Sequence, residues 1–527
     1  MSSTPPAPSD RLPSPETDVF AIHGADPEVL AYAMAKYSRS ALSMRQSLKE
    51  ISSQRAEQFL NTFYFQYGHR SIADLAHVAF AIERLSLLAA IVLVDEQRWD
   101  GQERSTRYQN FLKSGWYLPD FGEKSAARQL YVHTVEALFA SYASASAAVL
   151  EALKARVACP AEMKPDAYER ALKARAFDVA RYLLPLATNT SLGQIVNART
   201  LETQVSRLLS HQAGEIRDLG NKLKQAATGP AWNLQAEANA ALQAEIAALS
   251  PDLAVQSEPL LTRPIHASPT LVKYANPNPY EMQSKKELTQ AAAELFGDIP
   301  IAAAPMVDLV ERTESLEVEL AATLLYSASH HGYRQIRDLV AGLPEARVDE
   351  IVELGTRHRG RHDELLRAFH AGAALRFDIL MDIGGFRDMH RHRRCTQIIQ
   401  EFTLLHGYET PESGDAAGLA EAGILADYRA SVESAFAASR EIAACGAPEA
   451  TQSALYLLPL ATRVRSLFKM DFAEVQYIAE LRSAPAGHFS YRRVAWEMYL
   501  ALERQHPTLA KHIRVTDFTQ PIDLLQR

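Results

Sequence analysis

The chain has 527 residues, of which 47% are hydrophobic and 22% are charged, and its formal net charge is -8. This ordinary globular composition excludes a global affinity for nucleic acids or anionic membranes, so any anion site must be local. The length exceeds what one hydrophobic core usually holds and predicts several domains. The three cysteines are too few and too scattered for a disulfide framework, which indicates a reducing, cytoplasmic compartment.

The N-terminal residues 1–18, MSSTPPAPSDRLPSPETD, lack a basic start and an apolar stretch. We therefore expect a disordered N-terminal segment there rather than a signal peptide. The longest apolar run, LSLLAAIVLV at 85–94, is about half as long as a membrane span. It predicts a buried strand or helix, and no membrane association is expected.

The heptapeptide YLLPLAT occurs at 182–188 and again at 456–462. Between the two copies, the stretch from 251 to 279 holds six prolines and is not expected to form a continuous helix. Together these features predict two tandem repeats, 19–250 and 291–527, joined by a Pro-rich linker at 251–290.

Both repeats show the same order of elements: a helical stretch rich in Ala and Leu, a segment with His and Arg, an apolar run, a charged loop and long helices. In the first repeat Val78, Phe80 and Ile82 alternate as in a strand with one buried face, and apolar residues within 135–142 keep helical spacing. The pattern predicts an α+β fold with two tandem copies of a helix-rich domain, each with a small, mostly antiparallel sheet.

The first repeat contains one hydroxyl residue and three arginines that stand out. They are Ser105 and Arg107 in QERSTRY, Arg181 directly before YLLPLAT, and Arg199 in VNARTLE. A phosphomonoester site needs this set, because guanidinium groups bind phosphate oxygens bidentately and stay charged at every working pH. Residue types alone leave open that these arginines pair with surface carboxylates.

The second repeat contains MHRHRR at 389–394, with three Arg and two His. Such a patch could bind a pyrophosphate, an RNA backbone or a metal, or could be a solvated loop. No nearby carboxylate or cysteine completes a metal set, so no metal site is predicted. One basic loop in an acidic chain does not support nucleic-acid binding, which is not expected.

Together these pieces resemble the flavin-dependent thymidylate synthase family. The family signature is Arg-His-Arg, seven intervening residues and then Ser-x-Arg-Tyr. A Gly-His-x-Ser/Thr element precedes this signature. An Arg shortly before Leu-Pro and an Asn-Ala-Arg-x-Leu segment follow it. The first repeat matches, in this order, at Gly68-His69-Arg70-Ser71, Ser105-Thr106-Arg107-Tyr108, Arg181 before Leu184-Pro185, and Asn197-Ala198-Arg199-Thr200-Leu201. Its Arg-His-Arg positions hold Asp95, Glu96 and Gln97 instead.

The second repeat keeps the complementary half, Arg391-His392-Arg393. The remaining signature positions are lost: Glu401 and Thr403 stand at the Ser and Arg positions, Leu455 precedes Leu-Pro, and Asp471-Phe472-Ala473 replaces Asn-Ala-Arg. Each repeat has therefore lost what the other retains.

The resemblance implies conversion of dUMP to dTMP, a methyltransferase reaction that uses methylenetetrahydrofolate, FAD and NADPH. Family members are homotetramers with active sites between subunits, so it implies a homodimer acting as a pseudo-tetramer on a pyrimidine nucleotide. The residues it implies are Glu103, Ser105, Arg107, Tyr108 and Arg181 for the substrate, His69, Ser71, Asn197, Arg199, Arg391, His392 and Arg393 for FAD, and Arg207 or Arg482 as the activating, catalytic cation.

A second hypothesis follows from the losses. A divergent paralogue could keep the fold, with or without a nucleotide or flavin site, and have no thymidylate synthase activity. The two hypotheses differ in whether the retained half-signatures form one pocket.

Overall fold

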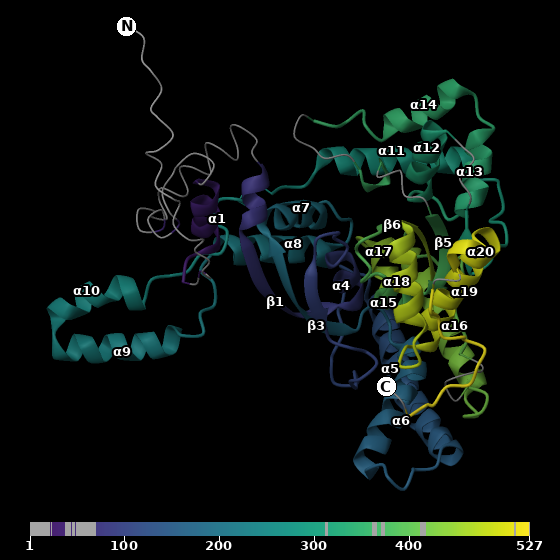
Figure 1. The fold of residues 1–527 in the computed structure, drawn as a ribbon, viewed down its shortest axis with the longest axis horizontal. Coiled ribbons are helices and arrows are strands. Elements are labelled where there is room, and N and C mark those ends of the chain that lie inside the picture. Colours follow the sequence, from purple (N-terminus) through teal and green to yellow (C-terminus); the bar gives the residue numbers. More distant parts are fainter. Residues whose placement is uncertain are drawn as a thin grey trace, which may run out of the picture. The chain divides into compact units, whose positions relative to one another are not determined.

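The computed structural model describes residues 22, 24–36, 44, 48, 70–273, 275–310, 315–360, 366–369, 375–411, 418–510 and 513–525. The chain forms two compact units, one of Met1–Ala76 with Thr228–Leu271 and one of His77–Ala227 with Val272–Arg527. Figure 1 shows the elements of both. No helix in the described ranges is both long and apolar enough to cross a membrane.

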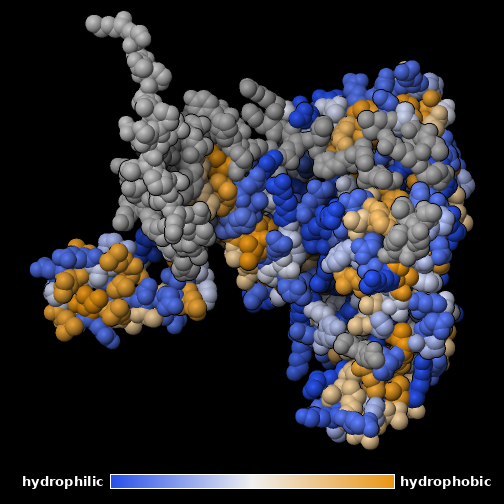
Figure 2. All heavy atoms as spheres, viewed as in Figure 1, coloured by the Kyte–Doolittle hydropathy of each residue, from blue (hydrophilic) through white to orange (hydrophobic). Residues whose placement is uncertain are grey.

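The regular elements described in the first unit are helices, namely α1 (Pro27–Lys36), η3 (Arg70–Leu75), α9 (Ala236–Leu249) and α10 (Pro251–Leu261). The carboxylate of Glu28 on α1 is buried and accepts hydrogen bonds from the backbone of Thr270 and Leu271 and from the Ser268 hydroxyl. Neither α9 nor α10 has a buried residue. Hydrophobic side chains therefore gather on the surface of this hairpin (Figure 2).

The predicted Pro-rich linker at 251–290 contains all of α10 and the first part of α11 (Pro279–Phe296). No continuous helix spans 251–279, as expected, because α10 ends at Leu261 and α11 begins only at Pro279. Pro251 and Pro279 each lie in the first turn of their helix, where the missing N–H has no helical acceptor to lose.

The second unit contains one antiparallel sheet from each repeat. The first sheet has the order β1-β3-β2, formed by β1 (His77–Ser86), β3 (Asn189–Asn197) and β2 (Asp100–Glu103). The second has the order β4-β5-β7-β6, formed by β4 (Val307–Leu309), β5 (Leu375–Asp382), β7 (Arg463–Met470) and β6 (Thr396–Ile399). The fold is α+β, as predicted.

The other regular elements described in this unit are helices. In the first repeat these are α4 (Leu87–Leu93), α5 (Ser125–Arg156), α6 (Pro165–Ala180), η4 (Arg181–Leu183), α7 (Ala198–Leu209) and α8 (Gly214–Thr228). After α11 the second repeat has α12 (Leu316–Tyr326), α13 (Tyr333–Ala341), α14 (Glu345–Leu354), η5 (Arg367–Phe369), α15 (Ile383–Met389), α16 (Leu425–Ala443), α17 (Ala450–Leu455), α18 (Phe472–Ser483), α19 (Phe489–Gln505) and α20 (Pro507–Ala510). The apolar run at 85–94 forms the buried helix α4.

Matching helix caps fix which residues correspond between the repeats. Ser86 at the end of β1 caps α4, and Asp382 at the end of β5 caps α15. Asn197 after β3 caps α7, and Asp471 after β7 caps α18 in the same way. Counting from these caps, Asp95-Glu96-Gln97 corresponds to Arg391-His392-Arg393, as the sequence alignment requires.

The two YLLPLAT segments pair with each other. The N–H of Leu186 donates to the carbonyl of Leu458 at 2.9 Å, and the N–H of Leu460 donates to the carbonyl of Leu184 at 2.9 Å. Pro185 and Pro459 face each other at the centre of this antiparallel contact. The repeated heptapeptide is thus the seam around which the two repeats join.

One hydrophobic core spans this seam and includes buried residues from both repeats. The long helices α5 and α16 pack along each other (Figure 1), and the hydroxyls of Ser141 and Ser431 are hydrogen-bonded at 2.8 Å. The parts of the two repeats that belong to the second unit therefore form one body, arranged like a dimer within a single chain.

Candidate functional site

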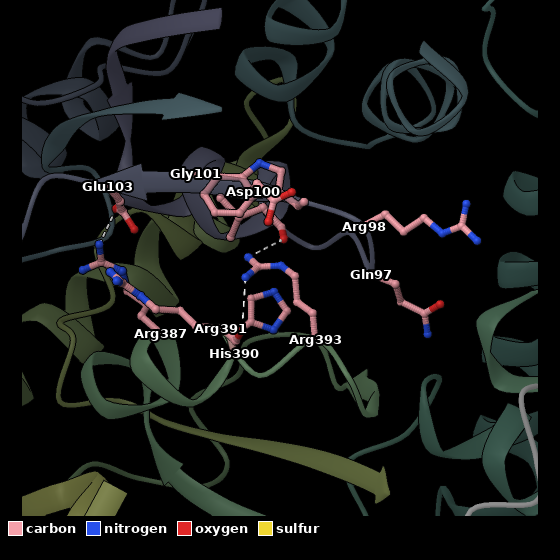
Figure 3. Close-up of a pocket in the computed structure, with 11 residues that line it drawn as sticks. Gln97, Arg98, Asp100, Gly101, Glu103, Arg387, His390, Arg391 and Arg393 are labelled. Carbon is pink, nitrogen blue, oxygen red and sulfur yellow. Dashed lines mark hydrogen bonds and ion pairs between the residues drawn. The ribbon is translucent and has the colours of Figure 1, made fainter. Parts of the chain in front are cut away.

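A cavity of about 500 Å³ lies between the repeats (Figure 3). Residues within 94–103 of the first repeat form one side, and Arg387, His390, Arg391 and Arg393 of the second form the other. This volume is in the range typical of small-molecule sites. The predicted flavin motif of one repeat and the segment leading to the nucleotide motif of the other thus meet at one cavity.

Arg391 and Arg393 of the predicted flavin motif both line this cavity. Arg391 is exposed, whereas Arg393 lies over the ring of Trp99, 4.5 Å from its centroid. Arg393 also donates hydrogen bonds to the carbonyls of Glu96 and Val94, at 3.1 and 3.2 Å. Burial and the charge of Arg391 lower the pKa of Arg393 to about 10, so it remains a cation at neutral pH.

His392, between these two arginines, is buried and contacts a different predicted site residue. Its Nε2 accepts a hydrogen bond from Nε of Arg482 at 2.7 Å, and its Nδ1 lies 3.5 Å from the carboxylate of Glu474. Burial lowers the pKa of His392, although Glu474 opposes the shift. The ring is therefore held as a neutral acceptor for Arg482.

Glu103 and Arg387 form an ion pair across the two repeats at the wall of the cavity (Figure 3). Beyond Glu103, the Ser105 hydroxyl accepts a hydrogen bond from the backbone N–H of Arg107 at 3.2 Å. Tyr108 is 57% exposed, and its ring lies 5.7 Å from the Arg107 guanidinium carbon.

The Arg107 guanidinium is buried and fully surrounded by partners. Its Nε donates to Asp178 at 2.7 Å, and its Nη1 donates to the Tyr491 hydroxyl at 2.7 Å. Burial lowers the pKa of Arg107, but the Asp178 charge and hydrogen bond more than offset this and raise it above its usual value. In this arrangement Arg107 is compensated by protein groups rather than open to a ligand.

Arg181 differs from Arg107 in its hydrogen bonds, although its charge interacts with the buried carboxyl of Asp382. Its Nη1 donates to the Thr106 hydroxyl at 3.3 Å and lies 3.6 Å from the Asp388 carboxylate. Within the described part of the chain, its Nε and Nη2 have no hydrogen-bond partner, although the residue is only 2% exposed. Such a cation gains from an added anion.

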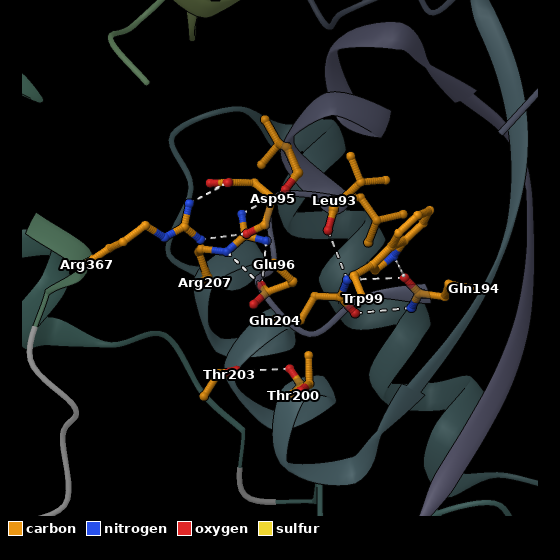
Figure 4. A network of polar contacts seen from close by, with 12 residues as sticks. Leu93, Asp95, Glu96, Trp99, Gln194, Thr200, Thr203, Gln204, Arg207 and Arg367 are labelled. Atoms are coloured by element: carbon orange, nitrogen blue, oxygen red, sulfur yellow. Dashed lines mark hydrogen bonds and ion pairs between the residues drawn. The ribbon is translucent and has the colours of Figure 1, made fainter. Parts of the chain in front are cut away.

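The acidic residues that replace the Arg-His-Arg motif in the first repeat are held by arginines (Figure 4). Arg207 bonds Glu96 at 2.7 Å, and Arg367 pairs with Asp95. Burial raises the pKa of Asp95, but the charges of Arg367, His390 and Arg207 outweigh it and lower that pKa below its usual range. The structure therefore separates the two candidate catalytic cations: Arg482 contacts the flavin motif, whereas Arg207 neutralises this loop.

Two of the other predicted FAD contacts, Asn197 and Arg199, do not line the cavity. The side chain of Asn197 accepts a hydrogen bond from the N–H of Thr200 at 2.8 Å and so caps α7, and Arg199 lies in the first turn of that helix. His69 lies outside the described residues. Ser71 belongs to η3 in the first unit, and its side chain is outside the described part.

Several polar residues of the site carry no family motif and were missed by sequence reasoning, namely Trp99, Asp178, Arg387, Asp388 and Tyr491. A comparison of the repeats supplies the signal that could have found some of them. Arg387 and Asp388 correspond to Ile91 and Val92, counted from the matching caps. The second repeat thus has charged residues at these two positions, whereas the first repeat has apolar residues at the corresponding positions.

Comparison with known proteins identifies relatives of both repeats. The model of the family described as thymidylate synthase complementing protein matches residues 21–229 and 308–508. A "UPF0159 protein" from Chlamydia muridarum is 28% identical over 552 residues, covering 96% of this chain and 93% of the relative. A flavin-dependent thymidylate synthase from Clostridium tetani is 24% identical over 200 residues, 38% of this chain and 76% of the relative.

Among solved structures, a flavin-dependent thymidylate synthase from Helicobacter pylori, complexed with FAD and dUMP, shares 17% identity with this chain. The match covers 38% of this chain and 89% of the other, with a TM-score of 0.26. A likeness this weak carries no conclusion by itself.

Proposed function

Because the chain belongs to the thymidylate synthase complementing protein family, whose model matches both repeats, we propose that it is a flavin-dependent thymidylate synthase. In this proposal it converts dUMP to dTMP. The observation that supports it is that Glu103, two residues before the Ser-x-Arg-Tyr motif of the first repeat, lines the same cavity as Arg391 and Arg393 of the second.

For the nucleotide we propose Glu103, Ser105, Arg107, Tyr108 and Arg181. The two unpartnered nitrogens of the buried Arg181 fit a phosphate, since an anion there would satisfy both donors and the charge. Arg107 would have to share its guanidinium between the phosphate and Asp178. Arg181 is therefore the stronger candidate for the primary phosphate contact.

For FAD we propose Arg391 and Arg393, with His392 behind them, and we retain His69, Ser71, Asn197 and Arg199 as further contacts. The cavity wall fits the group, because it combines two cations with the indole of Trp99. When bound, reduced FAD supplies the hydride, methylenetetrahydrofolate supplies the one-carbon unit, and NADPH restores the reduced flavin.

Arg482 is the proposed activating cation. One of its N–H groups is used by His392, and the rest of the guanidinium can stabilise negative charge that develops on a pyrimidine ring. Arg207 is the weaker candidate because Glu96 and the Val92 carbonyl hold it. A homodimer would complete a tetramer-like assembly, since one chain already contains a dimer-like pair.

The divergent paralogue remains a second candidate, and one observation favours it. Two cations of the site, Arg107 of the first repeat and Arg387 of the second, are already paired with Asp178 and Glu103. A site that has evolved away from phosphate binding would replace the ligand charge with such internal carboxylates.

An absorbance spectrum of the purified protein, with mass spectrometry of small molecules released on denaturation, tests the proposal. We expect the visible absorbance band of a bound flavin and formation of dTMP from dUMP. A colourless protein that FAD cannot reconstitute would rule out the synthase.

Substitutions taken from the opposite repeat then test the division of labour. Arg181→Leu introduces the residue found at Leu455 and should weaken dUMP binding while FAD stays bound. Arg391→Asp introduces the residue found at Asp95 and should do the reverse. The matched control is Arg156→Ala, because Arg156 forms only an exposed ion pair with Glu421. Loss of both ligands in either folded variant would contradict separate roles.

A further inference from the structure

Trp99 supports a cation that belongs to the other repeat. The guanidinium carbon of Arg393 lies 4.5 Å from the centroid of the indole ring, and Trp99 is only 7% exposed. A cation over an aromatic face is attracted by the ring quadrupole, and the attraction strengthens when water is excluded. The contact therefore fixes where the Arg393 charge lies.

A buried chain of amides holds the indole in place (Figure 4). Trp99 Nε1 donates to Gln194 at 2.7 Å, and the amides of Gln194 and Gln204 bond each other at 3.1 and 3.2 Å. Gln204 also donates to the carbonyl of Leu93 at 2.9 Å. Both glutamines are buried, so the ring orientation is set by groups that have no water to exchange with.

The neighbouring strand is shaped to the ring as well. A Cβ atom on Gly101 would come within 2.5 Å of the Trp99 side chain and would also collide with the Gly193 carbonyl. Only glycine leaves room for the indole at this point in β2. The space around Trp99 is thus built for that side chain.

The second repeat has lost this arrangement as a set. Counted from the matching caps, the counterparts of Trp99, Gln194 and Gln204 are Cys395, Phe468 and Ile478. The counterpart of Arg393 is Gln97 in the first repeat. The first repeat therefore has the indole and its amides, and the residue that the second repeat places against them is the cation Arg393. The second repeat lacks them, and the corresponding residue of the first repeat is the neutral Gln97.

We propose that Trp99 is a positioning residue for Arg393, so that the first repeat helps to form the cationic wall of the cavity although its own motif is acidic. Three of the five guanidinium N–H groups donate to the carbonyls of Glu96, Arg391 and Val94. The indole keeps the remaining two available for the anionic part of a flavin nucleotide. This inference rests on the proposed function.

Titration of FAD into the protein tests it, with dissociation constants measured by fluorescence for wild type, Trp99→Leu, Trp99→Phe, Arg393→Gln and the double variant Trp99→Leu/Arg393→Gln. The matched control is Trp496→Leu, because Trp496 stacks on Tyr499 and does not line the cavity. Loss of a desolvated cation–π contact should weaken FAD binding about tenfold in Trp99→Leu. Trp99→Phe keeps an aromatic face and should recover most of that affinity.

Comparing the effect of Trp99→Leu in wild type with its effect in Arg393→Gln distinguishes a positioning role of Trp99 from other roles. If Trp99 acts through Arg393, Trp99→Leu should have no further effect once Arg393→Gln is present. An equal loss in both backgrounds, or no loss in wild type, would overturn the inference.

If wild type binds no FAD, the proposed function fails, and the positioning role is still measurable without ligand. The emission of Trp99, obtained as wild type minus Trp99→Leu, should shift in Arg393→Gln. An unchanged difference spectrum would overturn the positioning role.

Discussion

The hydroxyl of Tyr491 accepts a hydrogen bond from Nη1 of Arg107 at 2.7 Å. The guanidinium of Arg482 lies over the ring of the same tyrosine, 5.3 Å from its centroid. Arg107 comes from the first repeat, and Arg482 binds His392 in the second, so one aromatic side chain joins the two half-signatures. The helices α8 and α19 begin at Gly214 and Phe489, so the counterpart of Tyr491 in the first repeat is Ile216, which can provide neither contact.

Two substitutions at Tyr491 should separate these contacts. Tyr491→Phe keeps the ring but removes an acceptor from a buried cation, which should lower the free energy of unfolding by about 1–2 kcal/mol. Tyr491→Ile also removes the ring and should cost about 3 kcal/mol. Urea unfolding followed by circular dichroism measures both. Equal losses would mean that the ring contact with Arg482 contributes nothing, and no loss in Tyr491→Phe would mean that the hydroxyl contributes nothing.

Much of the fold could be predicted from the sequence because it depends on local patterns. The apolar run that forms α4 and the alternation of Val78, Phe80 and Ile82 in β1 are periodic signals. The pairing of the heptapeptides was not predictable, since it uses backbone N–H and carbonyl groups that every residue carries. Repetition indicated duplication, but not that the copies touch.

The site residues, too, could be predicted only where a local sequence motif marks them. Motif residues such as Arg107 were found by likeness to a family, whereas Asp178 lies 71 positions away on a helix and has no motif around it. Only folding brings that carboxylate to the guanidinium. The state of Arg107, compensated by protein groups, therefore could not be inferred from its motif.

Reciprocal polar pairs at the ends of β1 and β5 provide a second prediction. In the first repeat the Ser86 hydroxyl donates to Glu215 at 2.6 Å, and in the second the Ser490 hydroxyl donates to Asp382. Donor and acceptor have exchanged places. Asp382→Ser should cost about 2 kcal/mol, because it weakens the cap of α15 and leaves two hydroxyls together.

Adding Ser490→Glu restores the arrangement of the first repeat and should recover part of this loss. Ser490→Glu alone brings two carboxylates together in a buried place and should be the least stable variant. Unfolding free energies of the four proteins form a double-mutant cycle. Strict additivity would show that the exchange of donor and acceptor has no energetic meaning.

Partly buried neutral histidines should make the protein sensitive to acid. Burial, with nearby positive charges, lowers the pKa of both His211 and His406 to about 4, from an ordinary value of 6.5. Between these two pH values the unfolded chain binds protons that the folded protein does not. Stability should therefore fall as the pH falls from 6.5 to about 4.

His406→Gln removes one such group, so its free energy of unfolding should decrease less steeply over this range than that of wild type. His133→Gln, at an exposed position on α5, is the control. Urea titrations at several pH values measure the slopes. A His406→Gln slope as steep as that of wild type would contradict the assignment.

The heptapeptide seam predicts that the two repeats unfold together. Leu186 and Leu458 are 0% exposed, bonded to each other through the backbone, and part of one core. Replacing either by Ala should cost about 2–5 kcal/mol. Because the two side chains belong to one core, the loss of unfolding free energy in the double variant should differ from the sum of the two single losses. Calorimetry should show one unfolding transition for this body in every variant. If Leu186→Ala instead splits that transition in two, the repeats are stable separately, and the seam is a contact between finished domains.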